Sequence, residues 1–357
     1  MRYLDHVTDK GIVLSPDKPG EAMHQWDGGG IREAILTQVD DTYYLSYDGA
    51  MPGATPTSYW NACQARSKDL LHWEKLGPNM LSSALTHPES SEEIYKDFRS
   101  ASSPWSFYAD GRWYHYYVGA DHCSLEGVPA FWYSTMLATS EKLTGKWHKR
   151  CDDNGCAKHV CFTVGQPGTW NDVTASPGQV LENPRWAADP AHEKRYLMFY
   201  SGSCSGETKR SLGIARTNDL GTSDDFDKAN GCFWQKDAEP ILPPEDDIEN
   251  TSIYYEAGSG LYWLFTNHIY NNEYTNSVWV YWTDDLEHWN ANNKAIVIDG
   301  SVSTWAHGAI GMPTVVQTDD HTLSLLYDAV PGDGTGHLER HVGLAEITLP
   351  LQVKAEG

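Results

Sequence analysis

The feature that most constrains this 357-residue sequence is an aromatic-rich strand pattern that occurs five times, at residues 43–47, 113–117, 196–200, 262–266 and 323–327. Runs of Tyr, Trp, Phe and Leu of this kind favour β-strands. Each copy is preceded by a second apolar run, and the clearest copies are followed by a polar-Asp-Leu-x-x-Trp signature such as residues 67–73. A pattern that returns at intervals of about 60–80 residues indicates a fold built from repeated units.

Four-stranded units that repeat radially form a β-propeller. We therefore predict that residues 1–357 form a single all-β domain, a five-bladed β-propeller with four-stranded blades around a central channel. The first 15 or so residues are expected to supply the strand that closes the ring onto the last blade. A pair of β-sandwiches is the alternative all-β fold, but it does not predict five similar units.

The charge balance restricts the partners. Lys and Arg total 26 against 49 Asp and Glu, which gives a formal net charge of −23. Because phosphate backbones and anionic lipid surfaces attract clustered cations, we expect neither nucleic acid nor a membrane as a partner. No signal peptide is visible, so we expect a cytoplasmic protein if Met1 is the native start and a secreted or periplasmic one if a leader was removed. The sequence does not predict the oligomeric state.

The aromatic composition is compatible with sugar binding. There are 15 Trp and 20 Tyr but only 8 Phe. Trp and Tyr present a flat apolar face and a polar edge, which suits the C–H faces and hydroxyls of a sugar. Strands favour aromatic residues for packing as well, so composition alone leaves both interpretations open.

The inner strands of a propeller converge on its axis, and we place residues 32–34, 102–104, 182–184, 249–251 and 311–313 at equivalent positions there. Three of these segments carry a glutamate, namely Glu33, Glu182 and Glu249. Burial and mutual repulsion would raise the pKa of at least one of them. A protonated and an ionised carboxyl side by side suit glycoside hydrolysis. The alternative is that each glutamate pairs with a nearby arginine, for which the candidates are Arg32, Arg99 and Arg185.

These motifs resemble the five-bladed glycoside hydrolases of family 43 and their clan relatives. The first blade of that family carries Asp-Pro, an apolar strand and then Gly-Asp-x-Tyr-Tyr-Leu, which is similar to residues 32–36 followed by 40–45. The Trp-Ala-Pro of the second blade resembles residues 102–104, and the Asp-Pro of the third blade resembles residues 183–184 beside Glu182. The acid motif Glu-Gly-Pro of the fourth blade resembles residues 249–251.

The resemblance implies that Glu33 is the general base, Glu182 the residue that orients and modulates the pKa, and Glu249 the general acid of an inverting hydrolase. Two departures are the glutamate in place of the family's base aspartate and Ala34 in place of its proline. Because a longer side chain displaces its carboxylate, Asp27 in the glycine-rich segment 25–30 is the reserve candidate for the base.

Further residues near the axial ends of the strands are candidates for substrate binding: Trp26, Arg32, Arg99, Trp105, Arg185, Trp305 and His307. The tryptophans either stack on a sugar or pack between blades. The reaction requires no cofactor, and we assign no metal ligand. Some family 43 enzymes hold a central metal ion such as calcium near a histidine of the fifth blade, but hydrogen bonding of His307 to substrate or backbone is the favoured interpretation. Cys151, Cys156, Cys161 and His159 form a local disulfide, remain thiols or bind zinc.

The predicted function is hydrolysis of a glycosidic bond in a plant- or algal-type oligo- or polysaccharide, with a furanosidase or xylosidase type of specificity. One alternative is a glycoside phosphorylase on the same fold, in which Arg32, Arg99 and Arg185 would bind phosphate. The other is a propeller that binds carbohydrate without turning it over.

Overall fold

The computed structural model describes residues 1–56, 58–77, 97, 100–120, 133–149, 164–206, 209–221, 234–270 and 273–355. These residues are almost entirely strands and loops. The helical elements among them are α1 (His24–Asp27) and the 3-10 helix η2 (Pro244–Asp246). Within the described ranges, no helix has the length and apolar character needed to cross a bilayer.

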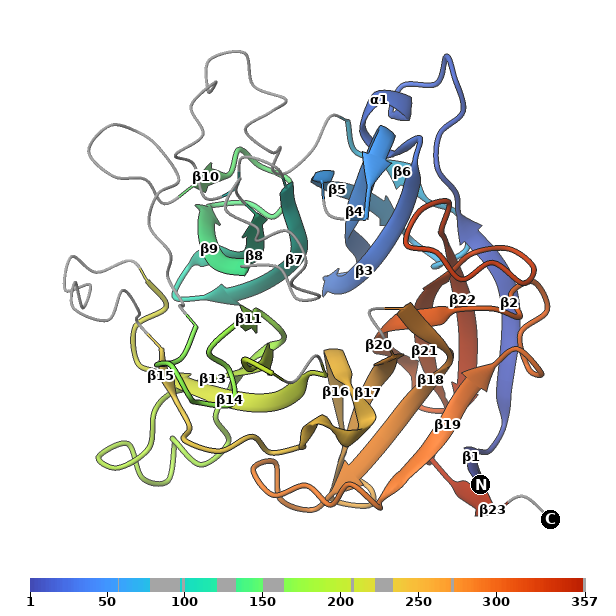
Figure 1. The fold of residues 1–357 in the computed structure, drawn as a ribbon. Helices are drawn as coiled ribbons and strands as arrows, with labels where there is room; N and C mark the ends of the chain where they lie inside the picture. Colours follow the sequence, from blue (N-terminus) through green and yellow to red (C-terminus); the bar gives the residue numbers. More distant parts are fainter. Residues whose placement is uncertain are drawn as a thin grey trace.

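The strands form five four-stranded blades in a ring (Figure 1). Blade 1 consists, from the axis outward, of β3 (Gly30–Val39), β4 (Thr42–Thr55), β5 (Ser58–Ser67) and β6 (Glu74–Lys75). Blade 2 consists of β7 (Ser100–Ala109), β8 (Arg112–Ala120), β9 (Tyr133–Ser140) and β10 (His148–Lys149). Blade 3 has an inner strand divided into β11 (Thr174–Ser176) and β12 (Val180–Glu182), followed by β13 (Tyr196–Ser203), β14 (Ser211–Thr217) and β15 (Gln235–Lys236).

The last two blades complete the ring. Blade 4 consists of β16 (Ile248–Glu256), β17 (Leu261–Tyr270), β18 (Glu273–Thr283) and β19 (Lys294–Asp299). Blade 5 takes β20 (Ile310–Asp319), β21 (Thr322–Ala329) and β22 (His341–Thr348) from the end of the chain and β2 (Val7–Leu14) from its beginning. The fold class predicted from the five repeats is confirmed.

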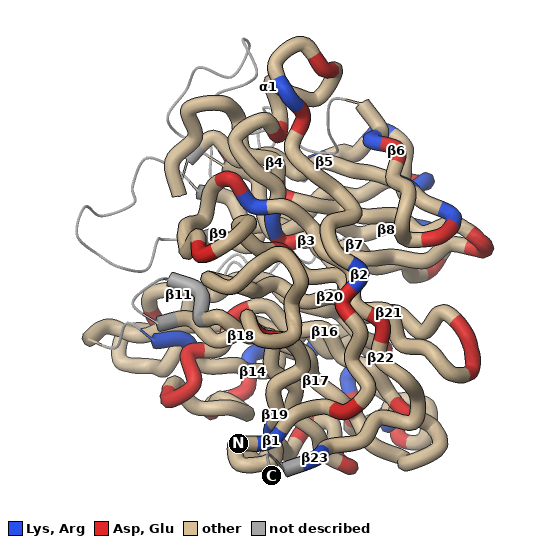
Figure 2. Tube along the Cα trace, turned by 90° about the vertical axis from the view of Figure 1, so that its right-hand side faces the viewer, with Lys and Arg blue, Asp and Glu red and all other residues tan. Residues whose placement is uncertain are grey.

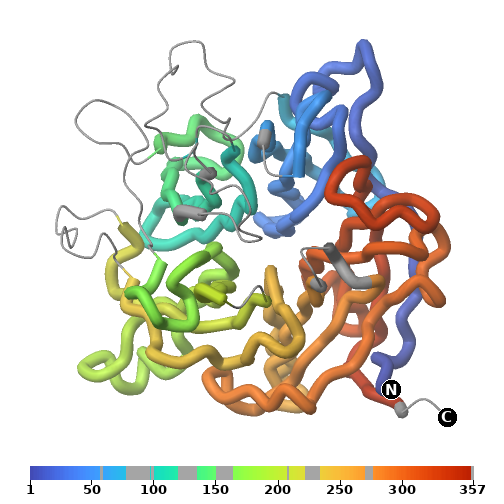
Figure 3. Tube along the Cα trace, viewed as in Figure 1, coloured from blue at the N-terminus to red at the C-terminus, as the bar shows by residue number. Residues whose placement is uncertain are grey.

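The two ends of the chain are joined in the same region of the ring. Strand β2 pairs antiparallel with β22 over the whole of its length and is the outermost strand of blade 5. A short strand β1 (Arg2–Leu4) pairs with β23 (Val353–Ala355) and with β19, so the N- and C-termini lie side by side (Figure 3). The edge of blade 5 is therefore covered by the first residues of the chain.

The inner hairpins follow from short polar turns. Val39 pairs with Thr42 and Ala109 pairs with Arg112, so each connection has two residues. Asp40 and Asp110 begin these turns with φ values of 53° and 51°. Two-residue hairpins need this left-handed conformation, and Asp tolerates it better than most other residues.

The hydrophobic core is divided among the gaps between neighbouring blades. In the gap between blades 4 and 5, for example, Phe265 and Val280 pack in one cluster with Leu325 and Tyr327. Separate clusters fill the gaps between blades 2 and 3, blades 1 and 5, blades 1 and 2, and blades 3 and 4. Each blade is thus held by apolar contact with both of its neighbours.

A polar group that we call the clasp joins the loop before the inner strand to the second and outer strands. In blade 1, Asp27 accepts hydrogen bonds from the Tyr47 hydroxyl at 3.1 Å and from the Lys75 ammonium at 2.6 Å. The same three residue types meet in blade 2 as Asp97, Tyr117 and Lys149. Blade 4 has a variant built from Asp246, Tyr281 and Lys294. The tyrosines of the first two clasps occupy equivalent positions in the repeated strand pattern, so the clasp is part of the repeat itself.

Charged residues are spread over the ring. Figure 2 shows Lys and Arg interspersed with the more numerous Asp and Glu, without a basic face in that view.

Replacing Lys75 with Met should destabilise the protein by about 3 kcal/mol, because the buried carboxylate of Asp27 and the partly buried one of Asp17 would both lose their cation. Urea denaturation followed by fluorescence measures this free energy of unfolding. The control is Lys68→Met, which removes an exposed ion pair with Asp41 and should leave the midpoint unchanged. Equal midpoints for both variants would show that the clasp does not stabilise the blade.

Candidate active site

Every inner strand carries one extra residue near its axial end, so that its pairing with the second strand shifts by one position. The residues at this bulge position are Glu33, Ser103, Pro177, Asn250 and Met312 in blades 1 to 5. Glu33, Ser103 and Met312 have φ near 50°. A left-handed non-glycine residue costs about 1–2 kcal/mol, so neighbouring contacts must hold the bulges in place.

Two of those contacts are visible as hydrogen bonds between blades. The carboxylate of Asp328 in blade 5 accepts the backbone N–H of Glu33 at 2.6 Å, and Asp48 in blade 1 accepts the backbone N–H of Ser103 at 2.8 Å. In blade 2 the equivalent of these aspartates is Val118, and the bulge residue of the next blade is Pro177, which has no N–H to donate. Blade 2 therefore lacks the carboxylate acceptor, and blade 3 lacks the N–H that this acceptor would bind.

Glu33, the bulge residue of blade 1, is buried and held by neighbouring polar groups. It is only 6% exposed, and the Ser103 hydroxyl donates to its Oε2. Arg32 Nε lies 3.7 Å from Oε1. Burial raises the pKa of Glu33 to about 7, against the opposing effect of Arg32, and the negative charge of Glu249 adds to the rise. Glu33 therefore exchanges its proton near neutral pH.

Glu249 begins the inner strand of blade 4, and its side chain is 13% exposed. Its Oε1 lies 3.2 Å from Nε of Arg210, a buried residue at the start of β14. The negative charge of Glu249, from blade 4, contributes to the raised pKa of Glu33 in blade 1. Two carboxyl groups with different partners can act as proton acceptor and proton donor.

The wall around Glu33 is charged and rigid. Arg32 bridges Asp48 at 3.4 Å, and its guanidinium stacks over the ring of Trp60 at 3.9 Å from the centroid. Burial, and then the nearby Glu33, raises the pKa of Asp48 well above its usual range. Arg32, predicted from the sequence as a substrate-binding residue, is thus already engaged by protein groups in the site.

Glu182 does not belong to this site, which corrects the sequence-based prediction. It pairs with Tyr196 at the end of the inner strand that is remote from the axial mouth. Its side chain is 56% exposed and bonded to Arg195, which also binds Asp110 of the β7–β8 turn. The residues of blade 3 that do lie in register with Glu33 and its neighbours are 176–178, namely Ser-Pro-Gly. Blade 3 therefore supplies no carboxylate at this position.

Asp27 also lies away from the axis. Its carboxylate is completely buried in the clasp of blade 1, where it contacts Lys75 and Tyr47 and accepts the backbone N–H of Asp17. The role of reserve base is excluded by these contacts, since they occupy both oxygens. Its neighbour Trp26 packs against the core between blades 1 and 5.

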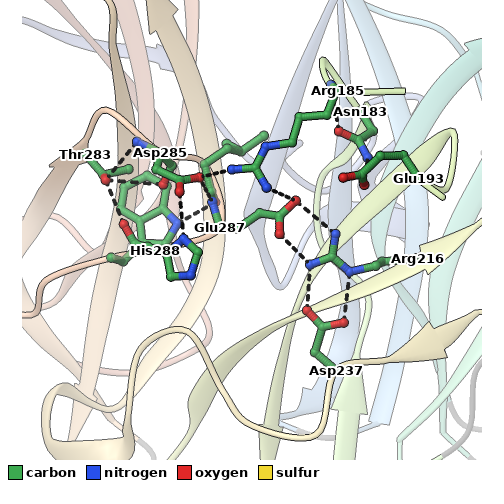
Figure 4. A network of polar contacts seen from close by, with 11 residues as sticks. Asn183, Arg185, Glu193, Arg216, Asp237, Thr283, Asp285, Glu287 and His288 are labelled. Carbon is green, nitrogen blue, oxygen red and sulfur yellow. Dashed lines mark hydrogen bonds and ion pairs between the residues drawn. The ribbon is translucent and has the colours of Figure 1, made fainter. Parts of the chain in front are cut away.

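Arg185 belongs to a polar network at the opposite end of blades 3 and 4 (Figure 4). Its guanidinium lies 2.6 Å from Asp285 and 3.3 Å from Glu287. Glu287 also binds Arg216, which forms a two-point pair with Asp237. Arg185 therefore joins blades 3 and 4 and does not approach the Glu33–Glu249 pair.

The remaining candidates differ in their surroundings. Trp105 is buried in the inner strand of blade 2, and its indole N–H has no acceptor among the described residues. Trp305 stacks on Tyr327 and donates to its hydroxyl, a structural contact within blade 5. Nδ1 of His307 hydrogen-bonds to the Gly300 carbonyl at 2.9 Å. Arg99 lies outside the described residues, as do Cys151, Cys156, His159 and Cys161.

The surroundings of His307 bear on the expectation of a central metal. Among the described residues, no group of three or more His, Cys, Asp and Glu side chains is arranged to hold a metal ion. The ring of His307 is hydrogen-bonded to backbone and its side chain is exposed.

Sequence reasoning missed Asp48, Asp328, Ser103, Arg210 and Asp247. Asp48 and Asp328 follow the last aromatic residue of the repeated pattern in blades 1 and 5, as Tyr47-Asp48 and Tyr327-Asp328. Superposing the repeats would have revealed this shared position. Arg210 and Asp247 lie outside the repeated pattern and leave no comparable signal.

Comparison with known proteins supports the fold. No protein-family model and no curated protein sequence matches the chain. Among solved structures, it is similar to a glycoside hydrolase (16% identity, TM-score 0.68) over 98% of this chain and 93% of the other. It is also similar to a family 117 glycoside hydrolase produced by the marine bacterium Zobellia galactanivorans (15%, TM-score 0.62, 98% and 94% covered). A thermostable family 43 glycoside hydrolase matches as well (14%, TM-score 0.60, 93% and 95% covered). The chain therefore shares, over nearly its whole length, the fold of these glycoside hydrolases.

Proposed function

We propose that the protein is a glycoside hydrolase in which Glu33 and Glu249 are the reacting carboxyl groups. The observation that carries the proposal is the buried Glu33 near the axial end of blade 1, whose pKa is raised by burial and further by the negative charge of Glu249 from blade 4. The shared fold with glycoside hydrolases supports the same reaction class.

In the proposed reaction Glu33 is the general base and Glu249 the general acid. Ionised Glu33 takes a proton from water as the water oxygen attacks the anomeric carbon, and Glu249 gives its proton to the leaving oxygen as the glycosidic bond breaks. A base with a pKa near 7 is well matched to work at neutral pH. The reaction inverts the anomeric configuration, as the resemblance to family 43 implies.

The proposed substrates are oligo- or polysaccharides of plant or algal type, cleaved with furanosidase or xylosidase specificity. The family 43-like motifs around Glu33 and Glu249 support this class. Aryl arabinofuranosides, xylosides, galactofuranosides and fucosides, tested beside plant and algal polysaccharides, identify the sugar. Hydrolysis of none of them would contradict the proposed class and favour a binding propeller.

Replacing Glu249 with Gln should lower kcat at least about a hundredfold on a substrate with a poor leaving group, because the proton donor is lost. The control is Glu182→Gln, which alters the exposed glutamate at the other end of blade 3 and should keep wild-type rates. Near-normal turnover by Glu249→Gln would remove Glu249 from the mechanism.

The pH dependence of kcat/KM should follow the ionisation of Glu33. Because the base works only when ionised and the pKa of Glu33 is about 7, kcat/KM should rise with pH and reach a plateau above about 7, before the falling limb set by the proton donor. At pH 5 it should be about a hundredfold below the plateau, since each pH unit below the pKa lowers the ionised fraction tenfold.

The variant Ser103→Gly tests this assignment. It removes the hydroxyl that stabilises ionised Glu33 and suits the positive φ at this position, so the rising limb should move to higher pH. Ser106→Ala, on the same strand but bonded to His115, should leave the limb in place. A limb that stays fixed in Ser103→Gly would mean that another group controls it.

Inorganic phosphate should not accelerate turnover. A phosphorylase would need a cluster of free cations, yet Arg32 is bound to Asp48 and Arg185 lies at the opposite end of the blades. Initial rates with and without phosphate, together with detection of any sugar phosphate, decide this point. Formation of a sugar 1-phosphate would replace hydrolysis by phosphorolysis.

A further inference from the structure

The mouth of the channel contains a further carboxylate, beside Glu249, that the sequence pattern does not reveal. Blade 3 has Ser176 and Pro177 where a third axial carboxylate was expected. Asp247, by contrast, lies two residues before Glu249 and is only 3% exposed. Its backbone is left-handed, with φ 48° and ψ 65°. A buried charge on a strained residue needs a compensating interaction, and here the partner is Arg210.

Asp247 and Arg210 are fixed to each other by backbone and side chain. Oδ1 of Asp247 accepts the backbone N–H of Arg210 at 2.7 Å and lies 3.5 Å from its Nη1. In return the N–H of Ile248 donates to the Arg210 carbonyl at 3.2 Å. Nε of the same guanidinium faces Glu249 at 3.2 Å. Asp247, Arg210 and Glu249 thus form one chain of charges that crosses from blade 4 to blade 3 and back.

We propose that Asp247, acting through Arg210, is a positioning residue that allows Glu249 to keep its proton at working pH; this inference rests on the proposed function. Arg210 alone would favour the ionised form of Glu249 and so oppose proton donation. The negative charge of Asp247 offsets that effect and leaves Arg210 to orient the carboxyl group. Blade 4 thereby supplies both the acid and the charge that tunes it.

Arg210 faces Glu249 directly, and the negative charge of Glu249 acts on Asp247 and, from blade 1, on Glu33. Burial raises the pKa of Asp247 to about 6, with Arg210 opposing the rise and Glu249 adding to it. Asp247 is therefore mostly ionised above about pH 6. The negative charge of Asp247 is therefore present at neutral pH and is lost at lower pH. At such a pH the proton donor does not depend on that charge to remain protonated.

The test compares Asp247→Asn with Asp246→Asn. The two residues are adjacent, but Asp246 binds Lys294 and Tyr281 away from the axis. In Asp247→Asn, Asn can still accept the Arg210 N–H, while the charge is lost. We expect the falling limb of the kcat/KM profile to move at least one pH unit lower, which is a tenfold loss on the alkaline side. Asp246→Asn should leave the limb where it is in the wild type.

Leaving-group dependence separates this role from a structural one. The substrates are the methyl and the dinitrophenyl glycosides of the sugar identified in the aryl-glycoside screen. Because dinitrophenolate leaves without protonation, Asp247→Asn should lose activity on the methyl glycoside and retain it on the dinitrophenyl glycoside. Equal losses on both substrates, or an unmoved limb, would overturn the inference.

A second variant distinguishes the proposed charge effect from a misfolded Asp247→Asn protein. Arg210→Gln removes the cation and should move the same limb in the opposite direction, to higher pH. If the falling limb moved in the same direction in Asp247→Asn and Arg210→Gln, the proposed chain of charges would be contradicted. Failure of the inference is distinguishable from failure of the proposed function, because only the latter predicts that Glu249→Gln remains active.

Discussion

A peptide N–H held by the carboxylate of the neighbouring blade is the contact on which the geometry of the axial mouth depends. Asp328 fixes the bulge of blade 1 and Asp48 fixes the bulge of blade 2. Without the bulge, a strand would alternate its side chains regularly, and Glu33 would not be held in its left-handed conformation against Ser103. The same bonds join consecutive blades, so the register between those blades and the placement of the Glu33 carboxyl group are set together.

These carboxylates can be buried because each forms an ion pair with an arginine. Asp328 is paired with the fully buried Arg340 at 2.6 Å, Asp48 with Arg32, and Asp247 with Arg210. Removing either partner of such a pair would leave a charge without solvation, whereas the intact pair has only a small net effect on stability. The axial mouth is therefore a polar wall of matched charges in which Glu33 shares Arg32 with Asp48. That shared cation is the reason why burial prevails and the pKa of Glu33 lies well above that of an exposed glutamate.

The sequence predicted the architecture because aromatic strands and two-residue turns are local signals that recur in every blade. It singled out Glu33 and Glu249 as candidates because both stand just before an apolar run. It failed at Glu182, since the run at 179–181 is only the second half of an inner strand that Pro177 and Gly178 divide, and Glu182 follows that half. It also failed at Asp27, whose partner Lys75 is brought to it only when the outer strand folds back. Long-range ion pairs of this kind leave no mark in local sequence pattern.

The strand β2 has a consequence for how the chain reaches its folded state. Its partner β22 is synthesised only after all the preceding blades, so residues 7–14 must wait for residues 341–348 before the circle can be completed. Contacts between segments so far apart in sequence slow folding, because the entropy of closing a long loop is lost before the contact is gained. Until that moment β2 and the outer edge of the last blade at β22 both lack their partner, and the nascent protein is most open to intermolecular strand pairing just before its final step.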